Sequence, residues 1–286
     1  MNLLKSVFIS VFFTWLALVS LYAFTQLLKG AEPLLAWLGL ALTGFAPLAF
    51  FLKAFLFKSP RTPRHPVEYS IVSGLGLAMT MAMSFRYGEA TGAIHVWAGI
   101  TLLGWFVYLR WYSVFRGRNS QALSVGSRLP VFELESMDGH VVSSESLMTK
   151  PHLLLFYRGN WCPFCTAQIE QLATNYQQLE AMGVKVILIS PQPQGKNQTL
   201  AARFDVPMTF LRDRNGTAAK QLGIQHEWGT PMGIQVFGYE SDSVFPTLLV
   251  TDAQGLIIFS DHTDNYRVRP ELNDIATLFI DNGMRN

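Results

Sequence analysis

The chain has 286 residues with a formal net charge of +2, and 50% of its residues are hydrophobic while only 15% are charged. A soluble domain usually carries about 25% charged residues, so one part of this chain is unusually apolar. The near-neutral charge gives no indication of a nucleic-acid partner, and the two cysteines exclude a disulfide-stapled scaffold and a four-cysteine metal site.

Long apolar runs fill the first part of the chain. A helix needs about 20 apolar residues to cross a hydrocarbon core of about 30 Å. The predicted spans are residues 6–28, 33–56, 68–85 and 93–112. No small-residue cleavage site follows the first span, so we interpret it as an uncleaved helix and not a signal peptide. The sequence therefore predicts an all-helical transmembrane anchor in the lipid bilayer over residues 1–118.

Basic residues indicate the orientation of the predicted spans. The second loop and the segment after the fourth span carry most of them: Lys58, Arg61, Arg64, Arg110, Arg116, Arg118 and Arg128. By the positive-inside rule, both chain ends face the cytoplasm, in what we interpret as a bacterial inner membrane. One span more or fewer would place the C-terminal domain in the periplasm instead.

Two features of the predicted anchor bear on its function. Ser70, Gly74, Ala78 and Ala82 recur every four residues, which predicts a small-residue face for close helix packing within the chain, with homodimerisation as the alternative. His95 lies beside Trp97 near the start of the fourth span, where we interpret it as a helix-end residue and not as a haem ligand. The predicted role of this half is anchoring.

Residues 125–286 show short apolar runs separated by turn signals, as in a mixed α/β domain. The predicted elements are a hairpin around Asp138-Gly139, strands at 152–157, 184–189, 208–211, 245–250 and 256–259, and helices at 162–182, 197–204, 217–222 and 271–280. They predict a central mixed sheet with helices on both faces. The segment 224–244 is long for a connection, and its Trp228, Phe237 and Tyr239 either shape a substrate groove or pack the segment against the sheet.

Cys162 and Cys165 lie where a strand meets a helix. Residues three apart in a first helical turn are close enough for a disulfide. The helix N-terminus favours a thiolate at Cys162, whereas Cys165 lies one turn in and suits a resolving role. Pro163 fixes the turn between them. Half of a zinc site, two buried structural cysteines and copper handling are the competing interpretations, and redox chemistry is the preferred one.

Phe156-Tyr157-Arg158-Gly159-Asn160-Trp161-Cys162-Pro163-Phe164-Cys165, followed by Gln168, resembles the peroxiredoxin-like branch of the AhpC/TSA (redoxin) family. Ser190-Pro191-Gln192 and residues 252–255 agree with that pattern, and the resemblance covers about residues 125–280. It implies a thioredoxin-like fold. The Cys-Pro-Phe-Cys centre is similar to that of glutaredoxins, and Pro246 lies where thioredoxin-fold proteins place a cis-proline.

The chain also departs from the family pattern. In the peroxiredoxin register, Arg158 replaces a proline, Cys162 replaces a threonine and Cys165 would be the peroxidatic cysteine. The arginine that assists peroxide cleavage would fall at Pro246 and is missing. Arg158 is one substitute for that charge. Arg267 and Arg269 are the others, although exposed arginines near a helix start are their alternative interpretation. The two registers leave open which sulfur attacks first.

We expect a membrane-anchored thiol oxidoreductase that cycles a Cys162–Cys165 disulfide, supported by Arg158, Trp161, Pro163 and Pro246. It would reduce peroxides or protein disulfides, with thioredoxin or glutathione as the external reductant and without a cofactor or metal. The alternatives are an extracytoplasmic protein-disulfide reductase and a non-catalytic copper-handling or redox-sensing module. The sequence does not indicate an oligomeric state.

Overall fold

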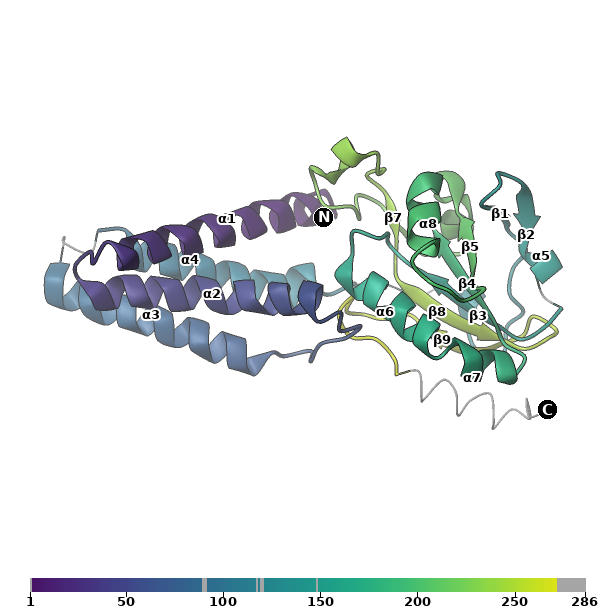
Figure 1. Cartoon of the computed structure of the whole chain (residues 1–286), viewed down its shortest axis with the longest axis horizontal. Coiled ribbons are helices and arrows are strands. Elements are labelled where there is room, and N and C mark those ends of the chain that lie inside the picture. The colour runs from purple at the N-terminus through teal and green to yellow at the C-terminus, as the bar shows by residue number, and fades with distance from the viewer. Residues whose placement is uncertain (1, 89–91, 117, 119–120, 148, 272–286) are drawn as a thin grey trace. The chain divides into compact units, whose positions relative to one another are not determined.

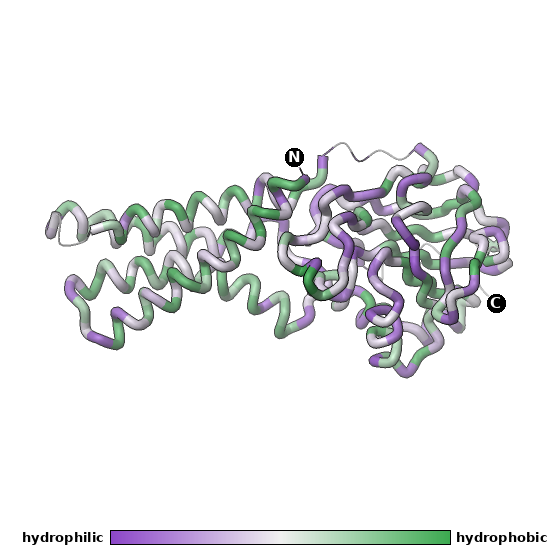
Figure 2. The backbone as a smooth tube through the Cα atoms, turned by 90° about the horizontal axis from the view of Figure 1, so that it is seen from above, coloured by the Kyte–Doolittle hydropathy of each residue, from purple (hydrophilic) through white to green (hydrophobic). Residues whose placement is uncertain are grey.

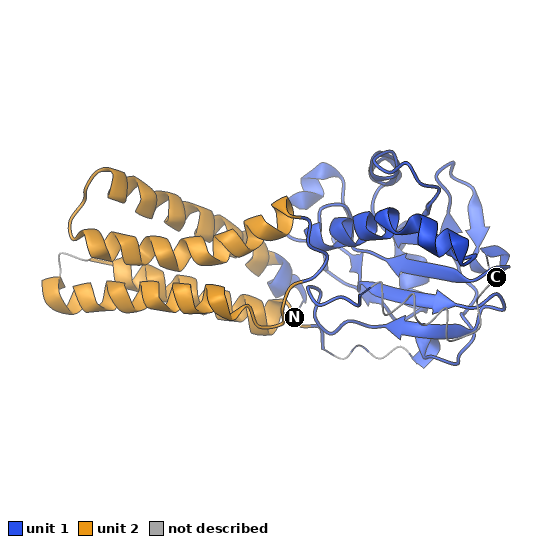
Figure 3. Ribbon diagram, turned by 60° about the horizontal axis from the view of Figure 1, so that its bottom comes forward, with its two compact units in different colours: residues 1–6, 58–61, 115–286 blue, residues 7–57, 62–114 orange. Residues whose placement is uncertain are grey.

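The computed structural model describes residues 2–88, 92–116, 118, 121–147 and 149–271. The chain divides into two compact units, coloured separately in Figure 3. One unit comprises residues 7–57 and 62–114, and the other comprises residues 1–6, 58–61 and 115–286. We refer to them as the helical unit and the redox unit and describe each by itself.

The helical unit is built from long apolar helices, which are coloured mainly green and white in Figure 2. They are α1 (Asn2–Leu28), α2 (Leu34–Leu56), α3 (Val67–Tyr87) and α4 (Ile94–Val107), and α4 continues into a π-helical turn, Tyr108–Tyr112. By length and composition, α1 and α2 are the helices within the described residues that are able to cross a membrane. The α-helical part of α4 has only 14 residues, fewer than the sequence predicted.

Small residues allow α2 and α3 to approach closely, but on a different face from the predicted one. A Cβ atom on Gly76 would lie 2.5 Å from the carbonyl oxygen of Gly39, whereas one on Gly74 would meet nothing within 4 Å. Beside this contact, Ser73 Oγ donates a 2.9 Å hydrogen bond to the Thr43 carbonyl. The prediction that Gly74 packs against another helix of the chain is therefore wrong, because the close contact lies at Gly76. Helix α3 carries two stripes of small residues, and its contacts with α2 decide which stripe is packed.

The redox unit contains a seven-stranded mixed sheet among its described residues, in the order β2-β1-β5-β4-β3-β8-β9 (Figure 1). Its strands are β1 (Glu133–Glu135), β2 (Val141–Ser143), β3 (His152–Phe156), β4 (Lys185–Ser190), β5 (Thr209–Arg212), β8 (Thr247–Thr251) and β9 (Ile257–Asp261). The β3–β4 and β4–β5 pairs are parallel, and β3 is antiparallel to β8. The predicted thioredoxin-like arrangement is thus confirmed.

Helices cover both faces of this sheet. Leu154 and Phe156 of β3 share a core cluster with Ala218 and Ala219 of α9 (Thr217–Gln221). Because side chains alternate along a strand, the neighbouring Leu153 and Leu155 point to the other face. That face is covered by the crossover from β3 to β4, which contains α6 (Pro163–Thr174) and α7 (Tyr176–Ala181) (Figure 1). β3 is consequently buried on both sides.

The helices of the redox unit differ in detail from their predicted bounds. The predicted helix at 162–182 is two helices, because Asn175 leaves the helical conformation and its Nδ2 donates a 2.8 Å bond to the Gln171 carbonyl. The helix predicted at 197–204 begins earlier, as α8 (Gln194–Ala201), directly after Pro193. A proline fixes its own φ and favours helix initiation after it. The helix predicted at 271–280 lies outside the described residues, apart from Glu271.

The segment 224–244 forms a small structure of its own. Its strands β6 (Gln225–His226) and β7 (Ser243–Val244) pair antiparallel, and a 3-10 helix, Ile234–Phe237, lies between them. The side chains of Trp228 and Phe237 are exposed. Neither of these two rings packs the segment against the sheet. Only Tyr239, of the aromatic residues singled out, reaches the loop before Cys162, through a hydrogen bond to Asn160 Oδ1.

Candidate active site

Both cysteines lie where β3 passes into α6. Strand β3 ends at Phe156, the loop 157–161 follows, and Cys162 is the N-cap of α6 with Pro163 in its first turn. The Cys162 carbonyl accepts bonds from the backbone N–H groups of Cys165 and Thr166, at 3.0 and 3.1 Å. Ligand sites of α/β sheets form at this carboxyl edge of the parallel strands. The sequence placed the pair correctly at this junction.

The two thiols form a buried, coupled pair. The exposed fraction of Cys162 is 1% and that of Cys165 is 0%, so Cys162 is less accessible than its predicted place at the helix mouth suggested. Burial opposes ionisation, but a hydrogen bond from Cys165 and the charges of Arg158 and Arg269 lower the pKa of Cys162 to about 6. Burial, together with the neighbouring Cys162 sulfur, raises the pKa of Cys165. One sulfur is therefore a thiolate at neutral pH and the other keeps its proton.

Arg158 supplies one of the two cations. Its guanidinium lies over the Trp161 ring at 4.6 Å and over the Tyr266 ring at 5.4 Å. The same guanidinium donates a hydrogen bond to the Gly229 carbonyl. Aromatic faces hold a guanidinium in place without neutralising it, which leaves its charge acting on the nearby thiol. Trp161 and Tyr266 thus fix the position of this charge.

Arg269 supplies the second cation and contacts the pair directly. Its Nη2 lies 3.9 Å from Cys165 Sγ, and its Nε donates a 2.9 Å hydrogen bond to the Tyr266 carbonyl. The alternative interpretation of Arg267 and Arg269 as exposed residues is wrong, since their exposed fractions are 0% and 6%. Both side chains therefore lie in the protein interior. Arg269 thereby reaches a cysteine sulfur.

Pro246 does not adopt the predicted cis peptide. The bond between Phe245 and Pro246 is trans. Phe245 N–H donates a 2.7 Å bond to the Ile224 carbonyl, and Thr247 already pairs with Phe156 in the sheet. An extended trans connection satisfies both pairings without reversing the chain. Arg118, from the N-terminal side of the domain, donates a 3.2 Å bond to the Pro246 carbonyl.

A buried polar network supports the loop before Cys162. Tyr157 Oη donates to Asn197 Oδ1 at 2.6 Å, and Gln192 Nε2 donates to Tyr157 Oη at 3.0 Å. Gln192 Oε1 in turn accepts the backbone N–H of Asn160 at 2.8 Å. Burial and the nearby Cys165 raise the pKa of Tyr157, so its hydroxyl stays protonated and donates. This network links the loops that follow β3 and β4.

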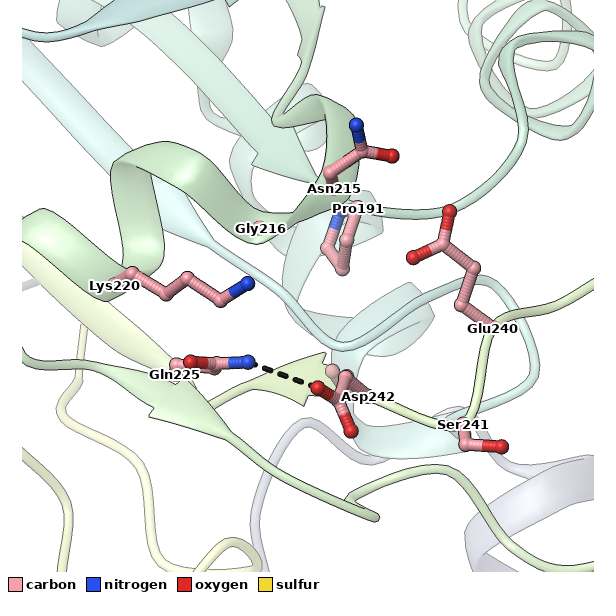
Figure 4. Close-up of a pocket in the computed structure, with 9 residues that line it drawn as sticks. Pro191, Asn215, Gly216, Lys220, Gln225, Glu240, Ser241 and Asp242 are labelled. Carbon is pink, nitrogen blue, oxygen red and sulfur yellow. Dashed lines mark hydrogen bonds between the residues drawn. The ribbon is translucent and has the colours of Figure 1, made fainter.

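A polar cavity of about 290 Å³ opens beside the end of β4 (Figure 4). Lys220 and Glu240 are among its lining residues, and Gln225 Nε2 donates a 2.8 Å bond to Asp242 Oδ2 across it. Another lining residue, Ser243, donates through Oγ to the Arg158 carbonyl at 3.1 Å. The wall of the cavity is therefore hydrogen-bonded to the loop 157–161, which precedes Cys162.

The structure brings together Arg158, Trp161, Cys162, Pro163 and Cys165, and it adds residues that the sequence did not single out for the site. These are Arg118, Tyr157, Gln192 and Tyr266. In the sequence, Arg118 is only a topology signal and Gln192 only part of a family pattern. Long-range contacts of this kind leave no local signal in a sequence. The described residues contain no group of three or more His, Cys, Asp or Glu side chains that would hold a metal ion.

Comparison with known proteins identifies the domain. Residues 125–260 match the AhpC/TSA family. A putative peroxiredoxin Bcp of Coxiella burnetii is 26% identical over 136 residues, covering 48% of this chain and 86% of that protein. Chloroplastic peroxiredoxin Q of Triticum aestivum is 30% identical over 123 residues, covering 43% of this chain and 57% of that protein. The chain thus spans little more than half the length of that plant relative.

Among solved structures, peroxidoxin BcpB of Mycobacterium tuberculosis aligns with a TM-score of 0.46 and 21% identity, over 56% of this chain and 97% of that one. The family match and the peroxiredoxin relatives confirm the resemblance drawn from the residues around Cys162. The part of the chain that matches the AhpC/TSA family, residues 125–260, thus contains both cysteines.

Proposed function

We propose that this protein is a thiol-dependent peroxidase whose cycle uses Cys162 and Cys165 alone. The observation that carries the proposal is the pair itself, in which Cys162 has a pKa of about 6 and Cys165 retains its proton. A thiolate is the attacking species in thiol chemistry, and a neighbouring protonated thiol is both a proton donor and a resolving group. The family match and the peroxiredoxin relatives support a peroxide as the oxidant.

The cycle follows from these protonation states. The Cys162 thiolate attacks the terminal oxygen of a hydroperoxide, the O–O bond breaks, and Cys162 becomes a sulfenic acid. The departing alkoxide takes the proton of Cys165 and leaves as an alcohol. The resulting Cys165 thiolate attacks the sulfenic sulfur, forms the disulfide and releases hydroxide, which solvent protonates to water. Two external thiols then reduce the disulfide and are themselves oxidised to a disulfide.

Arg158 and Arg269 have separate roles in this cycle. Arg158 lies among the rings of Trp161 and Tyr266 and lowers the pKa of Cys162. Arg269 contacts Cys165, where its charge stabilises negative charge that passes from the peroxide to the second sulfur. Fixed cations aimed at developing charge are among the strongest contributions to catalysis. Arg269 thereby takes the place of the arginine that is missing at Pro246.

Separate substitution of the cysteines tests the proposal. Cys162→Ser should abolish peroxide consumption. Cys165→Ser should react once, leaving a sulfenic acid at Cys162 that a sulfenic-acid probe and mass spectrometry detect. A sulfenic acid formed on Cys165 in the Cys162→Ser protein would assign the attack to the other sulfur. Turnover of protein disulfides without any reaction with peroxides would instead favour a disulfide reductase, for which the trans bond at Pro246 gives no support.

We further propose that the helical unit anchors the enzyme in a membrane, with the redox domain on the cytoplasmic face, where thioredoxin or glutathione is available. The apolar length of α1 and α2 supports this proposal. In a Cys162→Ser, Cys165→Ser background, Ser124→Cys should resist a membrane-impermeant thiol reagent in spheroplasts, whereas Lys29→Cys should react. The reverse labelling pattern would place the redox domain in the periplasm, and labelling of both positions would refute the anchor.

A further inference from the structure

Arg118 is held firmly within the redox unit. Its guanidinium donates to the carbonyl oxygens of Pro246 and Thr263, and Nη2 donates to Thr247 Oγ1 at 2.7 Å. It also lies 4.9 Å from the centroid of the Phe245 ring. A planar guanidinium suits such a set of acceptors, because its N–H groups point in fixed directions. Arg118 thus joins the start of β8 to the segment that begins at Thr263.

That segment, residues 263–269, carries Arg269 and is ordered by its own hydrogen bonds. Thr263 Oγ1 lies 2.6 Å from the carbonyl oxygens of both Asn265 and Val268, which share its single hydroxyl proton. Val268 N–H donates to the Asn265 carbonyl at 2.9 Å. Arg269 Nε then bonds to the Tyr266 carbonyl at 2.9 Å, which directs the guanidinium to Cys165. The position of Arg269 therefore depends on where Thr263 is held.

Phe115 also holds the segment 263–269 in place. Phe115 N–H donates a 2.6 Å bond to the Asp264 carbonyl, and the Phe115 ring lies 6.3 Å from that of Tyr266. Both Phe115 and Arg118 precede residue 125, and Arg269 follows residue 260. All three therefore lie outside the part of the chain that matches the AhpC/TSA family. The two flanks of the domain meet each other beside the cysteine pair.

We propose that Arg118 is a positioning residue, which sets Arg269 against Cys165 and thereby sets the ionisation of the cysteine pair. Its effect is indirect. The cations that lower the pKa of Cys162 are Arg158 and Arg269, and the charge of Arg118 repels that of Arg269. Arg118 acts by bonding the backbone at Thr263. The segment before residue 125 that contains Arg118 therefore forms part of the redox site. This inference rests on the proposed role of Cys162 and Cys165.

The test measures the thiolate directly in the purified full-length protein, by ultraviolet absorbance and by the pH dependence of alkylation. Arg118→Ala should raise the pH midpoint of thiolate formation by about one unit, a tenfold change in the ionisation constant. Millimolar guanidinium should restore the midpoint by occupying the vacated site. Arg128→Ala, which removes an exposed arginine near the start of the domain, should leave the midpoint unchanged.

The double variant separates positioning from a general structural effect. In an Arg269→Gln background, Arg118→Ala should add little further change, because its effect passes through Arg269. A fully additive change would overturn the proposal, as would an unchanged midpoint in a folded Arg118→Ala protein. Should Arg118→Ala fail to fold, Thr247→Val removes one acceptor alone and should produce a smaller change in the same direction; an unchanged midpoint there also overturns it. None of these measurements requires peroxide turnover, so they stand apart from a failure of the proposed activity.

Discussion

Replacing Arg269 by glutamine removes the guanidinium that lies 3.9 Å from Cys165 Sγ while keeping a side chain able to donate hydrogen bonds. Cys162 has a pKa of about 6 against an ordinary value of 9.0, and the charge of Arg269 is one of the causes of this lowering. A lowering of about three pH units corresponds to roughly 4 kcal/mol in favour of the thiolate. An opposite charge within about 4–6 Å of an ionisable group shifts its pKa by about 1–3 units.

We therefore expect the pKa of the reactive thiol in Arg269→Gln to rise from about 6 to about 7. Because the lowered pKa keeps the thiolate present at all pH values above it, the variant should lose reactivity mainly between pH 6 and 8. At pH 7 the thiolate fraction should fall from about nine tenths to about one half. Peroxide consumption should fall further, by about 100-fold or more, if the charge also stabilises the transition state.

Stopped-flow peroxide reduction across this pH range separates the two effects. Loss of thiolate moves the midpoint of the profile, whereas loss of transition-state stabilisation lowers its plateau. Arg203→Gln is the matched control, because Arg203 pairs with Glu170 of α6 at 3.4 Å on the protein surface. A variant with the wild-type midpoint and plateau would refute the assignment of Arg269 to the site, and an equal loss in Arg203→Gln would show a general effect of charge.

Three further predictions concern stability. Gly76→Ala should destabilise the helical unit by about 1–3 kcal/mol, because the new Cβ would lie 2.5 Å from the Gly39 carbonyl oxygen, while Gly74→Ala has free space; equal melting temperatures in detergent would contradict this. Gln192→Leu should lower the free energy of unfolding by about 1–3 kcal/mol in denaturant titrations, since it leaves Asn160 N–H without its acceptor and removes the bond donated to Tyr157 Oη. An unchanged midpoint would argue against the network. Burial and nearby cations hold the pKa of His226 well below 6.5, so near that pH only the unfolded chain takes up this proton. The free energy of unfolding should therefore decrease below pH 6.5, by up to about 1.4 kcal/mol per pH unit. His226→Phe should reduce this pH dependence, and an identical dependence in both proteins would assign it to other groups.

In the helical unit, local sequence patterns predict where the helices lie along the chain but not which of their faces pack together. The apolar runs indicated helices at nearly the observed places, because hydropathy is a property of consecutive residues. Hydropathy does not predict whether the Gly74 face or the Gly76 face of α3 is packed, since both faces contain small residues. Only the helix that packs against α3 decides between them. The predicted continuous helix after Cys162 failed for a related reason, because the side chain of Asn175 bonds back to Gln171 and ends the first helix.

The sequence by itself determined the class of this protein. Cys162, Pro163 and Cys165 lie next to one another in the chain, and a strand-to-helix junction with a helical N-terminus is a local pattern. The surroundings of the pair were decided by the tertiary structure. Arg118 and Arg269 are separated by the whole domain, yet Arg118 bonds both β8 and the segment 263–269 from which Arg269 reaches Cys165. The trans bond at Pro246 is likewise set by pairings with Ile224 and Phe156. Spacing along a chain fixes which groups are neighbours in a turn or helix, whereas the position of a charge from a distant segment depends on packing that no local pattern encodes.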